Sequence, residues 1–212
     1  LTVDLGDGND LLHLHDAAFV GFTMTDLLGH NRLRIEDVYV RDAISVTTGD
    51  GIDTLRLTRL HAARGVTLLT GGGNDFVKID SLTAGFPDSP NPAVSHLRVQ
   101  SGAGADRIYL TNSRVTGNYV IRTGDDKDTF TSHTNFAIGT IEVRMGDGAD
   151  VLDVTATTCN FQKTFSMDGG DDLLRSDALS QTGLVSNIGG QGTDIVDVDG
   201  IAGPNSGFEV IV

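Results

Sequence analysis

The chain lacks several residue types that common functions depend on. None of its 212 residues is tryptophan, and aromatic residues make up only 6%, so few side chains could stack on sugars or nucleic-acid bases. The single cysteine, Cys159, excludes an internal disulfide framework. No apolar run reaches the ~18 residues that a membrane-spanning helix needs. These shortages disfavour disulfide-stapled, membrane-spanning and base-stacking proteins.

Basic residues are also scarce. The chain has 15 Lys and Arg against 29 Asp and Glu, a formal net charge of −14, with a sequence pI near 4.5. Such a charge repels nucleic acids and anionic membrane surfaces. We therefore expect neither as a partner.

Glycine, in contrast, is abundant and periodic. Many of the 27 glycines gather in short turns of the type Gly-x-Gly-x-Asp. Clear copies occupy residues 6–10, 49–53, 71–75, 102–106, 146–150 and 190–194, blurred copies occupy 124–128 and 168–172, and a worn copy ends at Asn31.

The spacing of these turns predicts stacked units. The final Asp or Asn recurs at positions 10, 31, 53, 75, 106, 128, 150, 172 and 194, in steps of 21, 22, 22, 31, 22, 22, 22 and 22. The long step equals 22 plus a nine-residue insertion around the Pro-rich segment 86–92. A fixed step is typical of repeat proteins, and we expect the inserted loop at about 84–95 to protrude.

The pattern inside a unit predicts strands. The second and fourth residues after each turn Asp are mostly aliphatic and the third is mostly polar, a period of two that indicates one buried face. A second strand precedes the next turn, with inward pairs such as Val66/Leu68 and Ile141/Val143. The sequence predicts an all-β, right-handed parallel β-helix of about nine coils, in one domain over residues 1–212. A β-sandwich is the weaker alternative, because it would not hold the 22-residue step so steadily.

The turns resemble the hemolysin-type (RTX) calcium-binding repeat, G-G-x-G-x-D-x-U-x with U apolar. Residues 189–197 match every position, and 48–56 and 70–78 match all but the first glycine. The resemblance covers only the turns, which here recur once per coil rather than every nine residues. It implies Ca²⁺ between stacked turns, held by turn carbonyls and aspartate carboxylates. The implied ligands are Asp10, Asp53, Asp75, Asp106, Asp128, Asp150, Asp172 and Asp194.

Physical chemistry leaves two alternatives for these aspartates. Stacked coils would bring them to about 5 Å from each other, where two carboxylates repel by roughly 3 kcal/mol at an effective dielectric of ~20. Calcium would relieve that repulsion, and the extra acids Asp7, Asp50, Asp125 and Asp147 favour a cation. Alternatively each carboxylate turns inward and accepts N–H groups of its own turn, which would suit the interruption at Asn31.

We expect an extracellular or cell-surface structural and adhesive solenoid, resembling bacterial adhesin-like β-helix segments. Apolar strands at residues 1–5 and 208–212 predict that the end coils meet something, either another copy, end to end in a filament or surface layer, or flanking coils of a larger protein. A surface polysaccharide is a further candidate partner. We expect no enzyme activity.

The alternative function is a carbohydrate-active lyase or hydrolase, since β-helices also carry such sites. Its candidate residues are the outward Asp153, Asp177, Asp197 and Asp199, with Arg175 among them. An acidic solvated face explains the same residues more simply. By the same reasoning His13 and His15 are expected to be surface residues, and Cys159 a small buried one.

Overall fold

The computed structural model describes residues 1–85, 96–177, 180, 184–199, 205–206 and 208–211, and this part contains strands but no helix. It accordingly has no helix long and apolar enough to cross a membrane. The expected protruding loop at about 84–95 lies mostly outside the described residues.

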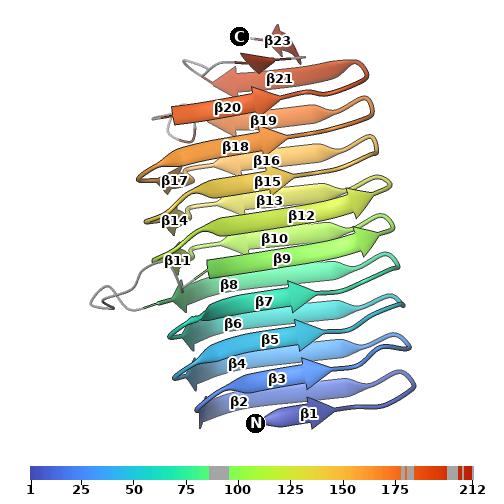
Figure 1. Cartoon of the computed structure of the whole chain (residues 1–212), viewed down its shortest axis with the longest axis vertical. Coiled ribbons are helices and arrows are strands. Elements are labelled where there is room, and N and C mark those ends of the chain that lie inside the picture. The colour runs from blue at the N-terminus through green and yellow to red at the C-terminus, as the bar shows by residue number, and fades with distance from the viewer. Residues whose placement is uncertain (86–95, 178–179, 181–183, 200–204, 207, 212) are drawn as a thin grey trace.

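The chain winds into a parallel β-solenoid of about eight turns, spaced about 22 residues apart, with the two ends of the chain at opposite ends of the stack (Figure 1). All strand pairs link one coil to the next in parallel, as the 22-residue step predicts; the right hand of the coil stays a prediction. One sheet has ten strands and the other thirteen. The ten-stranded sheet consists, in spatial order, of β1 (Thr2–Asp4), β3 (Phe22–Thr25), β5 (Ala43–Thr47), β7 (Gly65–Leu69), β9 (His96–Ala103), β12 (Tyr119–Asp125), β15 (Ile141–Arg144), β18 (Gln162–Ser166), β20 (Leu184–Ile188) and β22 (Asn205–Ser206).

The thirteen-stranded sheet lies opposite and changes character along its length. Its first four members are nine-residue strands, β2 (Leu11–Phe19), β4 (Arg32–Val40), β6 (Thr54–Ala62) and β8 (Phe76–Ala84). The following coils carry two shorter strands each, β10 (Arg107–Thr111) with β11 (Arg114–Val115), β13 (Thr129–His133) with β14 (Phe136–Ala137), and β16 (Val151–Thr155) with β17 (Thr158–Cys159). The sheet ends with β19 (Leu173–Asp177), β21 (Asp194–Asp199) and β23 (Phe208–Ile211).

One continuous aliphatic core fills the space between the sheets. The residues two and four positions after each turn form rows across neighbouring strands; Leu55, Val77 and Ile108, for example, stack in register and are fully buried. The expected inward pairs of the opposite sheet, such as Val66/Leu68 and Ile141/Val143, are buried as well. Burial at roughly 25 cal/mol per Å² makes this core the main favourable term in folding.

A bend in the coil lies within each nine-residue strand. It falls six residues after the turn Asp or Asn, where non-glycine residues adopt the left-handed region: Asp16, Asp37, Arg59 and Ser81 have φ values of 48°, 53°, 50° and 58°. The sequence does not mark this bend, because its residues share no chemistry. Stacking of equivalent bends stabilises a conformation that costs each residue about 1–2 kcal/mol.

The Gly turns allow a test of the stacking. Gly146 has φ +96° and a Cβ there would overlap the carbonyl oxygen of Gly124 in the preceding coil, whereas Gly6 has φ +82° but no atom within 4 Å of its virtual Cβ. We expect Gly146→Ala to lower the free energy of unfolding by more than about 3 kcal/mol. Gly6→Ala should cost only the conformational strain, about 1 kcal/mol. Urea unfolding of both variants measures this, and equal losses would contradict the close stacking.

Candidate functional site

The Gly-Asp turns stack along one edge of the solenoid through their own backbones. The N–H of Gly51 donates to the carbonyl of Gly72 in the next coil at 2.7 Å, and Gly73 donates to Ala103 in the same way at 2.7 Å. These bonds occupy turn carbonyls that the RTX resemblance assigned to calcium. They also hold successive turns in one register, which fixes where the turn aspartates point.

Inside this edge the turn aspartates form a continuous ladder. The Asp ladder comprises Asp10, Asn31, Asp53, Asp75, Asp106, Asp128, Asp150, Asp172 and Asp194. The Oδ1 atom of each, beginning with Asn31, accepts the backbone N–H of the ladder residue one coil earlier, at 2.7–3.2 Å. The structure therefore brings the predicted residues together, with the side chains turned inward. The donor differs from expectation, because it belongs to the neighbouring coil and not to the residue's own turn.

The second oxygen of each carboxylate is left without a partner. Ladder residues from Asp53 onward are no more than 2% exposed, and the Oδ2 atom of every ladder aspartate is buried with no hydrogen bond. An unpaired buried charge is costly. Either a proton or a cation on these oxygens would lower that cost.

The surroundings favour a proton. Across the turn lies a second row of inward hydroxyls, Thr48, Thr70, Ser101 and Thr123, each of which donates to the carbonyl of the equivalent residue in the next coil. Each hydroxyl also faces a ladder aspartate, and a hydroxyl that turns to donate to the carboxylate lowers the aspartate pKa. While the hydroxyl proton stays on the carbonyl of the next coil, the Oδ2 atom of a ladder aspartate can hydrogen-bond to that hydroxyl only by carrying a proton itself.

Burial shifts the acidity of the ladder in the same direction. Desolvation raises the pKa of Asp75, Asp128 and Asp150 to about 7 and that of Asp172 to about 6. The backbone N–H that each accepts partly opposes this rise, as do the hydroxyls of Thr70 at Asp75 and Thr123 at Asp128. Desolvation is the largest cause in each case, and neighbouring carboxylates add to it.

Asn31 shows what the ladder requires. Its Oδ1 accepts the N–H of Asp10 at 3.0 Å, and its own N–H donates to Asp53 at 2.7 Å. Its Nδ2 atom carries permanent protons and points to the carbonyl of Gly29 at 3.5 Å. A neutral amide thus performs the role of an aspartate here, so the ladder needs an acceptor oxygen and does not need a negative charge.

Calcium would find few free ligands in this arrangement. Ca²⁺ takes six to eight oxygens, but each coil offers one unpaired carboxylate oxygen, and turn carbonyls are engaged. Among the described residues no group of three or more His, Cys, Asp or Glu side chains is placed to hold a metal. The donor set of the ladder fits proton-bearing carboxyls better than a row of calcium ions.

Sequence reasoning missed a second polar row, at the corner of the later coils. Ser113 N–H donates to Asn135 Oδ1 at 2.9 Å, and Thr157 N–H donates to Ser180 Oγ at 3.0 Å. In earlier coils the corresponding positions are apolar, as at Leu60. Each long strand is replaced by two short ones where side-chain oxygens accept these backbone N–H groups. The sequence signal for this change is the polar residue seven positions after the turn Asp.

Lys163 is the other buried polar residue that the pattern did not predict. It occupies an inward position beside Ile141, is 1% exposed, and donates from Nζ to the carbonyl of Ser180 at 2.7 Å. Burial lowers its pKa and raises the pKa of the nearby Cys159 thiol. Cys159 is half-buried against the core, less enclosed than expected.

The described residues of the enzymatic alternative lie along a sheet face. Asp153, Arg175 and Asp197 align on three consecutive strands of the outer face, while Asp177 accepts N–H groups of Ala156 and Ser180, a structural role. The side chain of Asp199 lies outside the described residues. His13 and His15 are exposed, as expected, with acidic neighbours Glu36 and Asp16.

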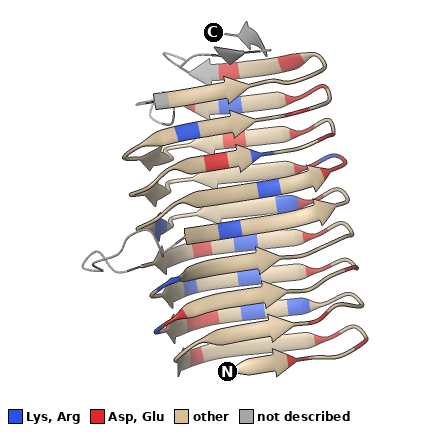
Figure 2. Ribbon diagram, in the orientation of Figure 1, with Lys and Arg blue, Asp and Glu red and all other residues tan. Residues whose placement is uncertain are grey.

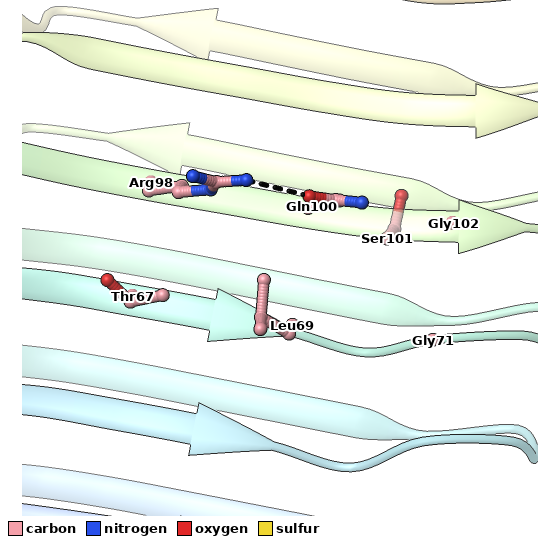
Figure 3. Close-up of a pocket in the computed structure, with 7 residues that line it drawn as sticks. All are labelled: Thr67, Leu69, Gly71, Arg98, Gln100, Ser101 and Gly102. Carbon is pink, nitrogen blue, oxygen red and sulfur yellow. Dashed lines mark hydrogen bonds between the residues drawn. The ribbon is translucent and has the colours of Figure 1, made fainter.

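Shallow hollows occur elsewhere on the surface. One of about 390 Å³ lies on the ten-stranded sheet, where Arg98 and Gln100 of β9 stand beside Thr67 and Leu69 of β7 (Figure 3). Arg98 donates to Gln100 at 3.0 Å. The residues that line the hollow include the hydroxyls of Thr67 and Ser101 but no carboxylate.

Searches of protein-family models, curated proteins and solved structures find no match for this chain.

The Asp ladder predicts an unusual dependence of stability on pH. Because the folded-state pKa of Asp128 is raised above its unfolded value near 3.9, the folded state binds more protons between these values. The stability that proton binding to Asp128 gives the folded state is fully present below about pH 4. It is lost as the pH rises through about 7. We expect the melting temperature to rise as pH falls from 8 to 6. Between the unfolded and folded pKa values, Asp128 alone changes the free energy of unfolding by about 1.4 kcal/mol per pH unit.

Two substitutions at one position serve as controls. Asp128→Asn keeps the acceptor for Asp106 N–H and removes the titration, so it should be at least as stable as the wild type at pH 8 and should flatten the pH dependence. Asp128→Ala leaves that buried N–H unpaired and should cost about 1–3 kcal/mol at either pH. A wild-type melting temperature that falls steadily below pH 8, unchanged in slope by Asp128→Asn, would refute the proton-bearing ladder.

Proposed function

We propose that the chain is an extracellular structural and adhesive solenoid, a rigid element that spaces or joins other structures. The observation that supports it best is the unbroken run of parallel ladders from the first described coil to the last (Figure 1). Core rows, turn bonds and the Asp ladder all run along the axis, so each coil is bonded to its neighbours on every side. Such a molecule resists bending and local opening.

Support for a location outside the cell comes from the resemblance of the turns to a repeat of secreted proteins. The first coil also offers a surface for association: β1 pairs with β3 and β2 pairs with β4, and the opposite edges of β1 and β2 have no described strand beside them. A further coil, from this chain's own continuation or from a second copy, would pair there and cover apolar residues such as Leu12 and Leu14.

The enzymatic alternative is tested by turnover. We expect no release of reducing or unsaturated ends from acidic or neutral polysaccharides, because Asp153, Arg175 and Asp197 stand in a row across three strands. Sedimentation should show association that grows with protein concentration. Turnover that is lost in Asp153→Asn and Arg175→Gln, but kept in the surface variant Arg144→Gln, would replace the structural role with the enzymatic one.

Calcium binding along the Gly-Asp edge stays a prediction of the turn resemblance. A ligand that binds only the folded state raises the melting temperature by mass action, so calcium added after chelation should raise it if the edge binds the ion. Asp128→Asn separates the two interpretations, since it would weaken a calcium site yet spare a proton-bearing ladder. No response of either protein to millimolar calcium would rule out a stabilising ion.

A further inference from the structure

The outer face of the thirteen-stranded sheet is mainly basic in its first half and of mixed charge in its second. His13, Arg34, Arg56 and Lys78 occupy equivalent outward positions on β2, β4, β6 and β8 and form one row along the axis. Further along the same row stand Asp153, Arg175 and Asp197. Lys and Arg mark the earlier strands in Figure 2.

A second outward row reinforces the basic half. Arg32 and Arg107 lie two residues before Arg34 and Tyr109 on β4 and β10, on the same face. We call the six side chains together the basic face, and all are exposed: His13, Arg32, Arg34, Arg56, Lys78 and Arg107. In a chain of net charge −14, this surface stands out by its sign.

Neighbouring acids neutralise only part of this charge. Glu36 accepts from Arg34 at 2.8 Å and lies 3.7 Å from His13. Asp80, near Lys78, is already held by the hydroxyl of Thr111 at 2.6 Å. These two carboxylates face five Lys and Arg side chains, so the basic face keeps a positive excess.

Aromatic rings lie within the basic face. The guanidinium of Arg56 sits over the ring of Phe76, 4.6 Å from its centroid, and the rings of Phe76 and Tyr109 are 5.6 Å apart. Both rings are partly exposed. They offer apolar surface to the faces of sugar rings, and the stacked Arg56 is held flat with its donors at the surface.

The spacing identifies the kind of partner. Adjacent strands lie about 4.8 Å apart, so a row across strands presents one cation per coil, a repeat comparable to the length of one pyranose unit. Duplex DNA carries one charge per ~1.7 Å, so the acidic body of this protein would repel it far more strongly. A ribbon-like chain with about one charge per sugar would match the spacing of the cations and could lie along the face of the sheet.

We propose that the basic face binds a linear anionic polysaccharide, with about one carboxylate per sugar, lying along the solenoid axis across β2 to β10. Carboxylates pair with Arg34, Arg56 and Lys78, and sugar faces contact Phe76 and Tyr109. This binding goes beyond the structural role and does not require calcium or end-to-end association.

The test uses polygalacturonate oligomers as the probe and neutral dextran oligomers as the comparison, with calorimetry at low and at physiological salt. The wild type should bind polygalacturonate with an affinity that falls with salt and should not bind dextran. The double substitution Arg56→Gln with Lys78→Gln should weaken polygalacturonate binding about tenfold. The control pair, Arg122→Gln with Arg144→Gln, removes the same charge beside Glu142 on the other sheet and should leave affinity within about twofold.

Several results would overturn the proposal. They are absence of polygalacturonate binding at low salt, an equal loss in both variant pairs, or tighter binding to single-stranded oligodeoxythymidylate of matched charge, which would assign a nucleic acid. Self-association abolished only by Arg56→Gln with Lys78→Gln would assign the face to a second copy. Matching circular dichroism and melting curves for all variants exclude misfolding as the cause. None of these outcomes depends on the turnover or calcium measurements above.

Discussion

The hydrogen bond from a turn backbone N–H to the carboxylate of the next coil is the constraint on which this solenoid depends. The N–H sits inside a tight Gly turn, where neither water nor a strand can reach it. Only a short side chain with an acceptor oxygen, pointing inward from the following coil, satisfies it. Since each aspartate both donates and accepts in this way, the ladder fixes the position of every coil relative to its neighbours.

This solution leaves one carboxylate oxygen per coil in a dry interior, and the rest of the edge accommodates it. The hydroxyl row lies beside these oxygens, and burial raises the pKa of the central aspartates to about 7 despite the hydrogen bonds that oppose the rise. One oxygen of each inward carboxylate accepts a backbone N–H of the preceding coil, and this bond holds the coils in register.

The outer surface is free of these constraints, because strand backbones are paired by the coil stacking whatever side chains point outward. The chain therefore carries basic residues on one half of a face while most of its charged turn residues are acidic (Figure 2). Repetition turns a single outward substitution per coil into a row with the strand spacing. A solenoid thus presents ordered linear arrays to linear partners more readily than a compact domain does.

The sequence by itself determined the coil length, the strand periodicity and the inward parity of the turn aspartates, because these follow from spacing alone. It also identified the core rows, such as Leu55 and Val77. It did not determine which N–H each carboxylate accepts. The same N–H group recurs in every coil, so the sequence pattern cannot distinguish a donor in the same coil from one in the neighbouring coil. Nor did it place the left-handed corner at Arg59 or the interior bonds of Asn135. These depend on stacking, which stabilises conformations and buries polar groups that no single segment would favour alone.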